Sequence, residues 1–156
     1  MDVAIVSVTE YANMHGKDPG NVRRMLICGR LQGYKIGKQW VIDDAIQYPK
    51  DKRIKNGRYK IYSLSELMDM IKPILKKYNA EGATLFGSYA RNEATASSDI
   101  DLLVNGGKNF DATDIFCIAD ELYEASGKQV DVYEKSEITK ESDLYGAIIK
   151  EGVAIV

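Results

Sequence analysis

The chain has 156 residues, of which 45% are apolar and 28% are charged, and its formal net charge is −2. This composition is typical of one ordinary globular domain or two small ones, and it excludes low-complexity and collagen-like chains. No apolar run approaches the roughly 20 residues that a membrane-spanning helix requires. The first residues lack the basic leader and the cleavage site of a signal peptide. We therefore expect a cytoplasmic protein without membrane contact.

The small net charge conceals two halves of opposite sign. Residues 1–62 contain 12 Lys and Arg against 6 Asp and Glu, whereas residues 63–156 contain 9 against 17. A basic surface favours polyanionic partners, and an acidic one can hold cations that in turn hold phosphates. The asymmetry predicts two modules with different partners.

The first module, residues 1–50, predicts two short helices followed by a β-hairpin. Ser7 and Glu10 have the spacing of a capping box at the start of a helix over residues 6–16. Asp18 is a suitable N-cap for a second helix, with Pro19 in its first turn. The stretch GYKIGKQWVI then has the pattern of a strand, a Gly-Lys turn and a second strand. Two short helices joined by a tight turn form a helix-turn-helix.

Residues 51–63 are rich in basic side chains and lack periodicity, so we interpret them as a basic linker. The second module, residues 64–156, alternates between helical and strand-like apolar patterns. The predicted elements are helix 64–78, strand 83–86, short helix 88–94, strand 99–104, helix 111–126, strand 129–134, a helix at about 140–150 and a terminal strand 152–156. We expect an α+β fold in which helices flank a mixed sheet.

Two aspartates interrupt an apolar strand in the string GSYARNEATASSDIDLLV. Residues two apart on a strand point to the same side, so Asp99 and Asp101 share a face. Mg²⁺ would remove their mutual repulsion and the cost of their burial, because hard cations prefer carboxylate oxygens. Asp131 completes the cluster if the two strands adjoin, and Glu134 is its rival. The apolar run after Asp101 argues against the alternative interpretation, a solvated strand edge.

The Gly-Ser pair at the start of the same string predicts a phosphate-binding turn. Gly87 ends a strand and tolerates a close approach of other groups to its backbone. Ser88 begins a short helix, whose free N–H groups favour phosphate. Arg91 adds a cation, which either steadies phosphate charge or locks the loop. These residues predict a nucleotide-binding site beside the carboxylates.

These motifs resemble the nucleotidyltransferases of the DNA polymerase β superfamily. The local string is most similar to the minimal nucleotidyltransferases of prokaryotes, small proteins that often work beside an all-helical HEPN partner in toxin–antitoxin pairs. The resemblance covers residues 64–156 and implies Mg²⁺-dependent transfer of NMP from ATP or another NTP to a hydroxyl. The implied roles are Gly87 and Ser88 on the β- and γ-phosphates, Asp99 and Asp101 on two metal ions, and Asp131 on the catalytic metal and the acceptor hydroxyl.

The first module is similar to the winged helix-turn-helix of excisionase and MerR-type proteins. The resemblance implies that the second helix enters the major groove of DNA and that the hairpin contacts phosphates or the minor groove. The implied contacts are Asn21, Arg23 and Arg24 on the helix and Lys35 and Lys38 on the wing. The alternative for the two arginines is a solvated helix face.

Two functional hypotheses follow. The first is an enzyme that transfers NMP, with AMP favoured, to a tyrosine of a HEPN-type partner or to a small molecule, as antibiotic-modifying relatives do. The shortness of the catalytic unit favours a partner protein. The second is a DNA-binding antitoxin or transcriptional regulator with a non-catalytic scaffold, and Ser88, Asp99 and Asp101 argue against it. The sequence also leaves a homodimer as an open alternative.

Asn92 departs from the pattern of these nucleotidyltransferases, which commonly have Gly at this position. Asn tolerates a left-handed backbone, so we expect little damage from this departure.

Overall fold

The computed structural model describes residues 3–50 and 59–155. The chain divides into two compact units, Met1–Asp51 and Lys52–Val156. Most of the predicted basic linker lies outside the described residues. None of the helices in the two described ranges combines the length and the apolar character that crossing a bilayer requires.

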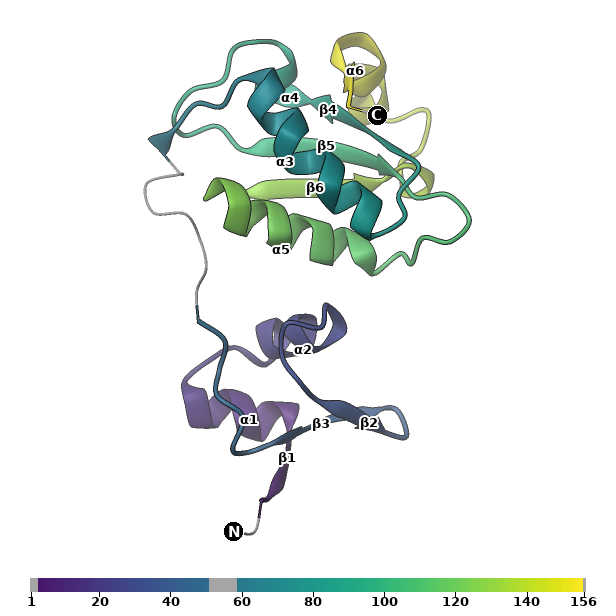
Figure 1. Cartoon of the computed structure of the whole chain (residues 1–156). Helices are drawn as coiled ribbons and strands as arrows, with labels where there is room; N and C mark the ends of the chain where they lie inside the picture. The colour runs from purple at the N-terminus through teal and green to yellow at the C-terminus, as the bar shows by residue number, and fades with distance from the viewer. Residues whose placement is uncertain (1–2, 51–58, 156) are drawn as a thin grey trace. The chain divides into compact units, whose positions relative to one another are not determined.

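The N-terminal unit packs two helices against an antiparallel sheet with the strand order β1-β3-β2 (Figure 1). Its elements are β1 (Ile5–Ser7), α1 (Val8–His15), α2 (Pro19–Ile27), β2 (Tyr34–Ile36) and β3 (Gln39–Asp43). The predicted helix starts are confirmed: Ser7 and Glu10 form a complete capping box, and the Asp18 carboxylate accepts a hydrogen bond from the Asn21 backbone N–H at 3.0 Å. The sequence did not predict β1, which is only three residues long.

The C-terminal unit is built on a four-stranded sheet with the order β6-β5-β4-β7. Strands β5 and β6 are parallel, whereas β4 runs antiparallel to β5 and β7, so the predicted mixed sheet is confirmed. The elements are α3 (Leu64–Lys77), β4 (Gly82–Phe86), α4 (Gly87–Ala90), β5 (Ile100–Asn105), α5 (Asp114–Ser126), β6 (Val130–Glu134), the 3₁₀ turn η2 (Lys135–Glu137), α6 (Asp143–Glu151) and β7 (Val153–Ala154).

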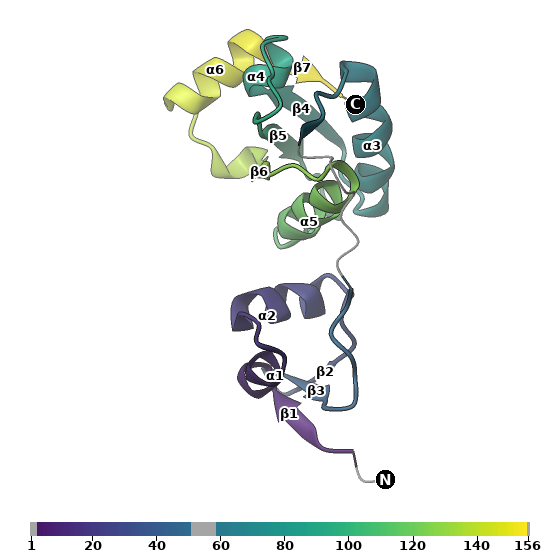
Figure 2. The same cartoon turned by 90° about the vertical axis from the view of Figure 1, so that its left-hand side faces the viewer.

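Different helices cover the two faces of this sheet. Helices α3 and α5 lie on one face, and α6 lies on the other (Figures 1 and 2). Leu102 of β5 packs with Ile118 of α5 in the main core, whereas Leu103 packs with Ile148 of α6 in a smaller cluster. Because side chains alternate along a strand, Asp101 shares the α6 face with Leu103. The aspartate therefore lies away from the main core.

Several boundaries differ from the predictions, among them those of α4, α5 and β5. Helix α4 is shorter than predicted, and Asn92, two residues beyond its end, takes a left-handed φ of 59°. This conformation agrees with the expected tolerance of Asn at this position. Helix α5 begins three residues later than predicted, because Asp111 accepts hydrogen bonds from the N–H and the hydroxyl of Thr113 in a preceding turn. Strand β5 begins at Ile100, so Asp99 lies immediately before it.

Candidate active site

The parallel pairing of β5 and β6 brings two of the predicted acids together. The register places Asp101 directly opposite Asp131, so the two side chains lie on the same face of the sheet. Val130 and Val132 pack in the main core, which directs Asp131 to the other face, as predicted. The adjacent strands that the third carboxylate required are therefore present.

Strand β4 delivers the Gly-Ser pair to the same end of the sheet. Phe86 pairs with Asp101, and Gly87 follows directly. Gly87 has a φ of 73°, and a Cβ built on it would lie 2.3 Å from Oδ2 of Asp101. Glycine is favoured here, because any other residue would have a strained backbone conformation and its Cβ would displace the Asp101 carboxylate. Ser88, half-buried, is the second residue of α4.

The surroundings of Asp101 raise its affinity for a proton. Burial, and then the charges of Asp131 and Asp99, raise the pKa of Asp101 to about 6, against a smaller opposing effect of Arg91. Asp99 itself is exposed and lies immediately before β5. Within the described ranges, no group of three or more His, Cys, Asp or Glu side chains is arranged closely enough to form a metal-binding set. The structure thus shows an Asp101–Asp131 pair with Asp99 as an electrostatic neighbour.

Glu134, the rival third carboxylate, lies three residues farther along β6, opposite Val104. Its carboxylate accepts hydrogen bonds from the backbone N–H of Ser136 at 2.7 Å, from the Ser136 hydroxyl and from the Gly106 N–H at 3.4 Å. Burial raises the pKa of Glu134, but these hydrogen bonds outweigh it and hold the pKa below its usual value. The side chain caps η2 at the opposite end of the strand, so it does not join Asp101.

Arg91 bridges two segments rather than standing free. Its Nε donates to Glu93 at 2.9 Å, and its Nη1 donates to Glu151 of α6 at 3.0 Å. These hydrogen bonds raise the pKa of the guanidinium. Of the two roles considered for Arg91, the geometry supports the lock between the loop after α4 and helix α6.

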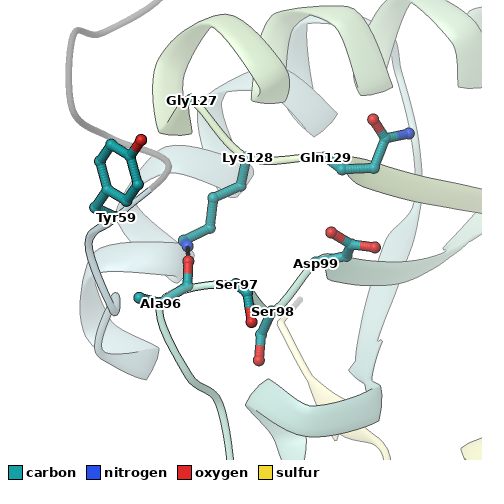
Figure 3. Close-up of a pocket in the computed structure, with 8 residues that line it drawn as sticks. All are labelled: Tyr59, Ala96, Ser97, Ser98, Asp99, Gly127, Lys128 and Gln129. Carbon is teal, nitrogen blue, oxygen red and sulfur yellow. Dashed lines mark hydrogen bonds between the residues drawn. The ribbon is translucent and has the colours of Figure 1, made fainter.

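A pocket of about 310 Å³ opens beside Asp99 (Figure 3). It contains Lys128, whose side chain reaches across to donate from Nζ to the Ala96 carbonyl at 2.8 Å. The pocket is lined by Tyr59, Ala96, Ser97, Ser98, Asp99, Gly127, Lys128 and Gln129. Lys128 escaped the sequence analysis because a Gly-Lys-Gln stretch between a helix and a strand has the pattern of an ordinary surface loop. The one available signal was a lysine two residues before the strand-like run that begins at Val130.

In the N-terminal unit, a groove of about 480 Å³ lies between α2 and the hairpin. Its lining includes Arg23, Lys35 and Lys38, together with Trp40, and the Lys35 ammonium lies 5.3 Å from the centre of the Trp40 ring. Asn21 and Arg24 are exposed on α2 and do not line this groove. The structure therefore gathers three of the five predicted DNA-contacting residues in one place.

Comparison with known proteins identifies the second unit. Residues 69–156 match the model of the family described as "Polymerase beta, Nucleotidyltransferase". Two similar proteins come from Methanocaldococcus jannaschii. "Putative protein adenylyltransferase MJ0435" is 44% identical over 70 residues, which are 45% of this chain and 75% of that protein. "Putative protein adenylyltransferase MJ0128" is 41% identical over 80 residues, which are 49% and 82% of the two chains.

A solved structure shares the fold. It is described as "Crystal structure of the toxin-antitoxin with AMP-PNP", and it superposes with a TM-score of 0.51 over 57% of this chain and 72% of that chain, at 22% identity. Such a low identity supports the fold alone. The family match covers more than half of the chain and contains the β4–α4 turn, β5 and β6. The chain therefore belongs to the polymerase beta nucleotidyltransferase family.

Proposed function

We propose that the chain transfers AMP from ATP to a hydroxyl of a protein acceptor. The observation that carries the proposal is the packing of Gly87 against the Asp101 carboxylate, which in turn pairs with Asp131. It joins a phosphate-binding turn and an acidic pair at one end of one sheet. The two relatives named as protein adenylyltransferases support both AMP as the transferred group and a protein as the acceptor.

In this mechanism the Gly87–Ser88 turn binds the phosphates of ATP, and the acids activate the acceptor hydroxyl. Backbone N–H groups of Gly87 and Ser88 hold the β- and γ-phosphates. Asp131 orients the acceptor hydroxyl and takes its proton as the hydroxyl oxygen bonds to the α-phosphorus. The bond from that phosphorus to the β-phosphate oxygen breaks, and pyrophosphate leaves. Arg91 acts indirectly, because its bridge to Glu151 holds the loop after α4 against α6.

The acidic residues fit a divalent cation such as Mg²⁺. Asp101 and Asp131 would hold it, since carboxylate oxygens suit hard cations and the two residues are paired on adjacent strands. Asp99, which is exposed and is not gathered with them into a set of three, would join as a third ligand only if its side chain turned toward the pair. When bound, a pair of such ions would stabilise the negative charge of the α-phosphate and of the leaving pyrophosphate. The chain's own contribution is the fixed spacing of the acids on paired strands.

For the acceptor we propose a tyrosine of a HEPN-type helical partner. The solved structure that shares this fold is described as a toxin-antitoxin with AMP-PNP, and this description supports a partner protein as the acceptor. For the N-terminal unit we propose binding to duplex DNA through a winged helix-turn-helix. The groove that contains Arg23, Lys35 and Lys38 supports this assignment, because basic side chains on a helix and a wing fit the phosphate backbone.

The test is transfer of radioactive label from [α-³²P]ATP. The full chain is incubated with Mg²⁺ and the product of the neighbouring gene, and label is expected on a tyrosine of that product. The Asp101→Asn variant should leave the partner unlabelled. An unlabelled partner with the wild-type chain at saturating Mg²⁺ would refute the enzyme, and salt-sensitive DNA binding by the same inert preparation would support a non-catalytic regulator instead.

A further inference from the structure

We propose that Lys128 is a positioning residue, which fixes the segment that leads into Asp99 against the segment that leads into Asp131. Its side chain is 3% exposed. Its Nζ donates to the Ala96 carbonyl at 2.8 Å, so a buried ammonium spans the space between the two segments (Figure 3). This role rests on the proposed function, since it concerns the placement of the catalytic acids.

The segment on the Ala96 side is a tight turn that ends at the first acid. The Ser98 N–H donates to the Thr95 carbonyl at 3.1 Å, and the Thr95 N–H donates to the Ser98 hydroxyl at 2.8 Å. Two residues later, the Ile100 N–H donates to the Gln129 carbonyl at 3.0 Å. Lys128 and Gln129 therefore hold this segment at two successive points, one on each side of Asp99.

The other end of Lys128 is anchored in the core. Its backbone N–H donates to the Ser126 hydroxyl at 3.1 Å, and that hydroxyl donates to the Leu122 carbonyl at 2.6 Å. The Tyr62 hydroxyl donates to the Ser126 carbonyl at 2.6 Å. Ser126 and Lys128 are the two buried polar residues among those that the structure describes. The ammonium thus extends from a hydrogen-bonded corner just after α5.

The choice of lysine indicates a function beyond filling space. Burial of an ammonium is unfavourable, and it lowers the pKa of Lys128, whereas the nearby charge of Asp99 raises it. An apolar side chain of similar length would fill the same space without that penalty. What lysine adds is a donor for the Ala96 carbonyl and a positive charge beside the acidic end of the sheet.

The experiment compares Lys128→Met with wild type and with Lys150→Met, which removes an exposed lysine of α6. We expect Lys128→Met to keep the wild-type melting temperature or exceed it, and to keep the affinity for ATP. Hydrogen exchange of the peptide over residues 95–100 should become at least 10-fold faster, while exchange in α5 stays unchanged. The kcat for transfer should fall 10- to 100-fold with KM for ATP unchanged. Lys128→Arg should recover most of the kcat, because the adjacent pocket provides space.

Unchanged exchange over residues 95–100 in Lys128→Met would overturn the proposal, and so would a wild-type kcat in that variant. If Lys128→Met does not fold, the same two measurements on Lys128→Arg and Lys128→Gln decide, with exchange expected to be slower in the arginine variant; equal exchange in both would overturn the proposal. If the wild-type chain transfers no AMP, the proposed function fails, whereas the exchange measurement still judges Lys128 independently.

Discussion

The pair of strands β5 and β6 carries acidic side chains at both ends. At the two ends the surroundings shift the pKa of an acidic side chain in opposite directions. At one end Asp101 faces Asp131, and burial with two neighbouring acids raises its pKa to about 6. At the other end Glu134 receives hydrogen bonds from Ser136 and Gly106, which hold its pKa below the usual value. Glu134, which stabilises the fold, is surrounded by hydrogen-bond donors. Asp101, which we propose for the chemistry, has other acids as its neighbours.

The largest expected effect separates the two ends by activity. Asp101→Asn and Asp131→Asn should each lower the transfer rate by about 1000-fold or more, because each removes a group needed in the transition state. For Asp131→Asn the affinity for ATP should stay within about twofold of wild type, since this residue faces the acceptor. Glu134→Gln is the matched control and should retain most of the activity. The assay is transfer of labelled AMP together with ATP binding.

Transfer by Asp131→Asn at a rate close to that of wild type, with an inactive Glu134→Gln, would reverse the assignment of the two ends. That result would mean that β6 presents Glu134 to the acceptor, and not the Asp131 that pairs with Asp101.

A second effect tests the contact between the turn and the acid. Gly87→Ala should lower transfer by about 100-fold and destabilise the fold by about 1–3 kcal/mol, because the new Cβ would collide with the Asp101 carboxylate and the residue has a positive φ. Gly146→Ala in α6 is the control, since a Cβ there meets nothing within 4 Å. That variant should be as stable as wild type or slightly more stable. Transfer kinetics and thermal melting of both variants provide the comparison.

A third, smaller effect is on stability as a function of pH. Folding raises the pKa of Asp101 from 3.8 to about 6, so the folded state binds its proton more tightly than the unfolded state. Ionisation of Asp101 therefore costs stability above pH 6, and this cost disappears as the pH falls from about 6 to about 4. Asp101→Asn should stabilise the metal-free protein by about 1–2 kcal/mol at pH 7.5, after allowance for solvent screening, and by nothing at pH 4.

Glu134 should behave with the opposite sign in the same measurement. Its pKa is lowered in the folded state, so its stabilising effect is present at neutral pH and is lost as the pH falls through that lowered pKa. Glu134→Gln should therefore lower stability at pH 7.5. Denaturation curves of both variants at the two pH values check the signs, and the same sign for both variants would contradict the contrast between the two ends.

The smallest effect concerns Arg91. If it acts as the lock seen in the structure, Arg91→Gln and Glu151→Gln should each lower kcat only a few-fold, and the double variant should be no worse than the single ones. If Arg91 instead contacts phosphate, Arg91→Gln alone should raise KM for ATP. Steady-state kinetics of the three variants distinguish the two roles.

Most of the elements, and the strand face on which each acid lies, could be predicted from the sequence because they depend on local patterns. Ser7, Asp18 and Gly87 have short-range roles in caps and turns, and the Val130–Val132 alternation is enough to orient Asp131. The role of Glu134 could not be predicted, because the Ser136 donors reach it only where η2 turns the chain, and the Gly106 donor comes from the residue after β5. The bridge from Arg91 to Glu151 joins residues 60 positions apart, and it depends on where α6 packs. Such contacts follow from tertiary packing, which no local spacing encodes.

The parallel pairing of β5 with β6 also sets the order in which the site forms. Gly87 meets Asp101 through an antiparallel pair of neighbouring strands, which closes a short loop. Asp131 lies 30 residues beyond Asp101 and reaches it only after the crossover through α5 has packed on the sheet. Loop closure of this kind is slow relative to local pairing. A partly folded chain would then have the turn and one acid but not Asp131, the proposed proton acceptor, so the proposed transfer would await completion of the domain.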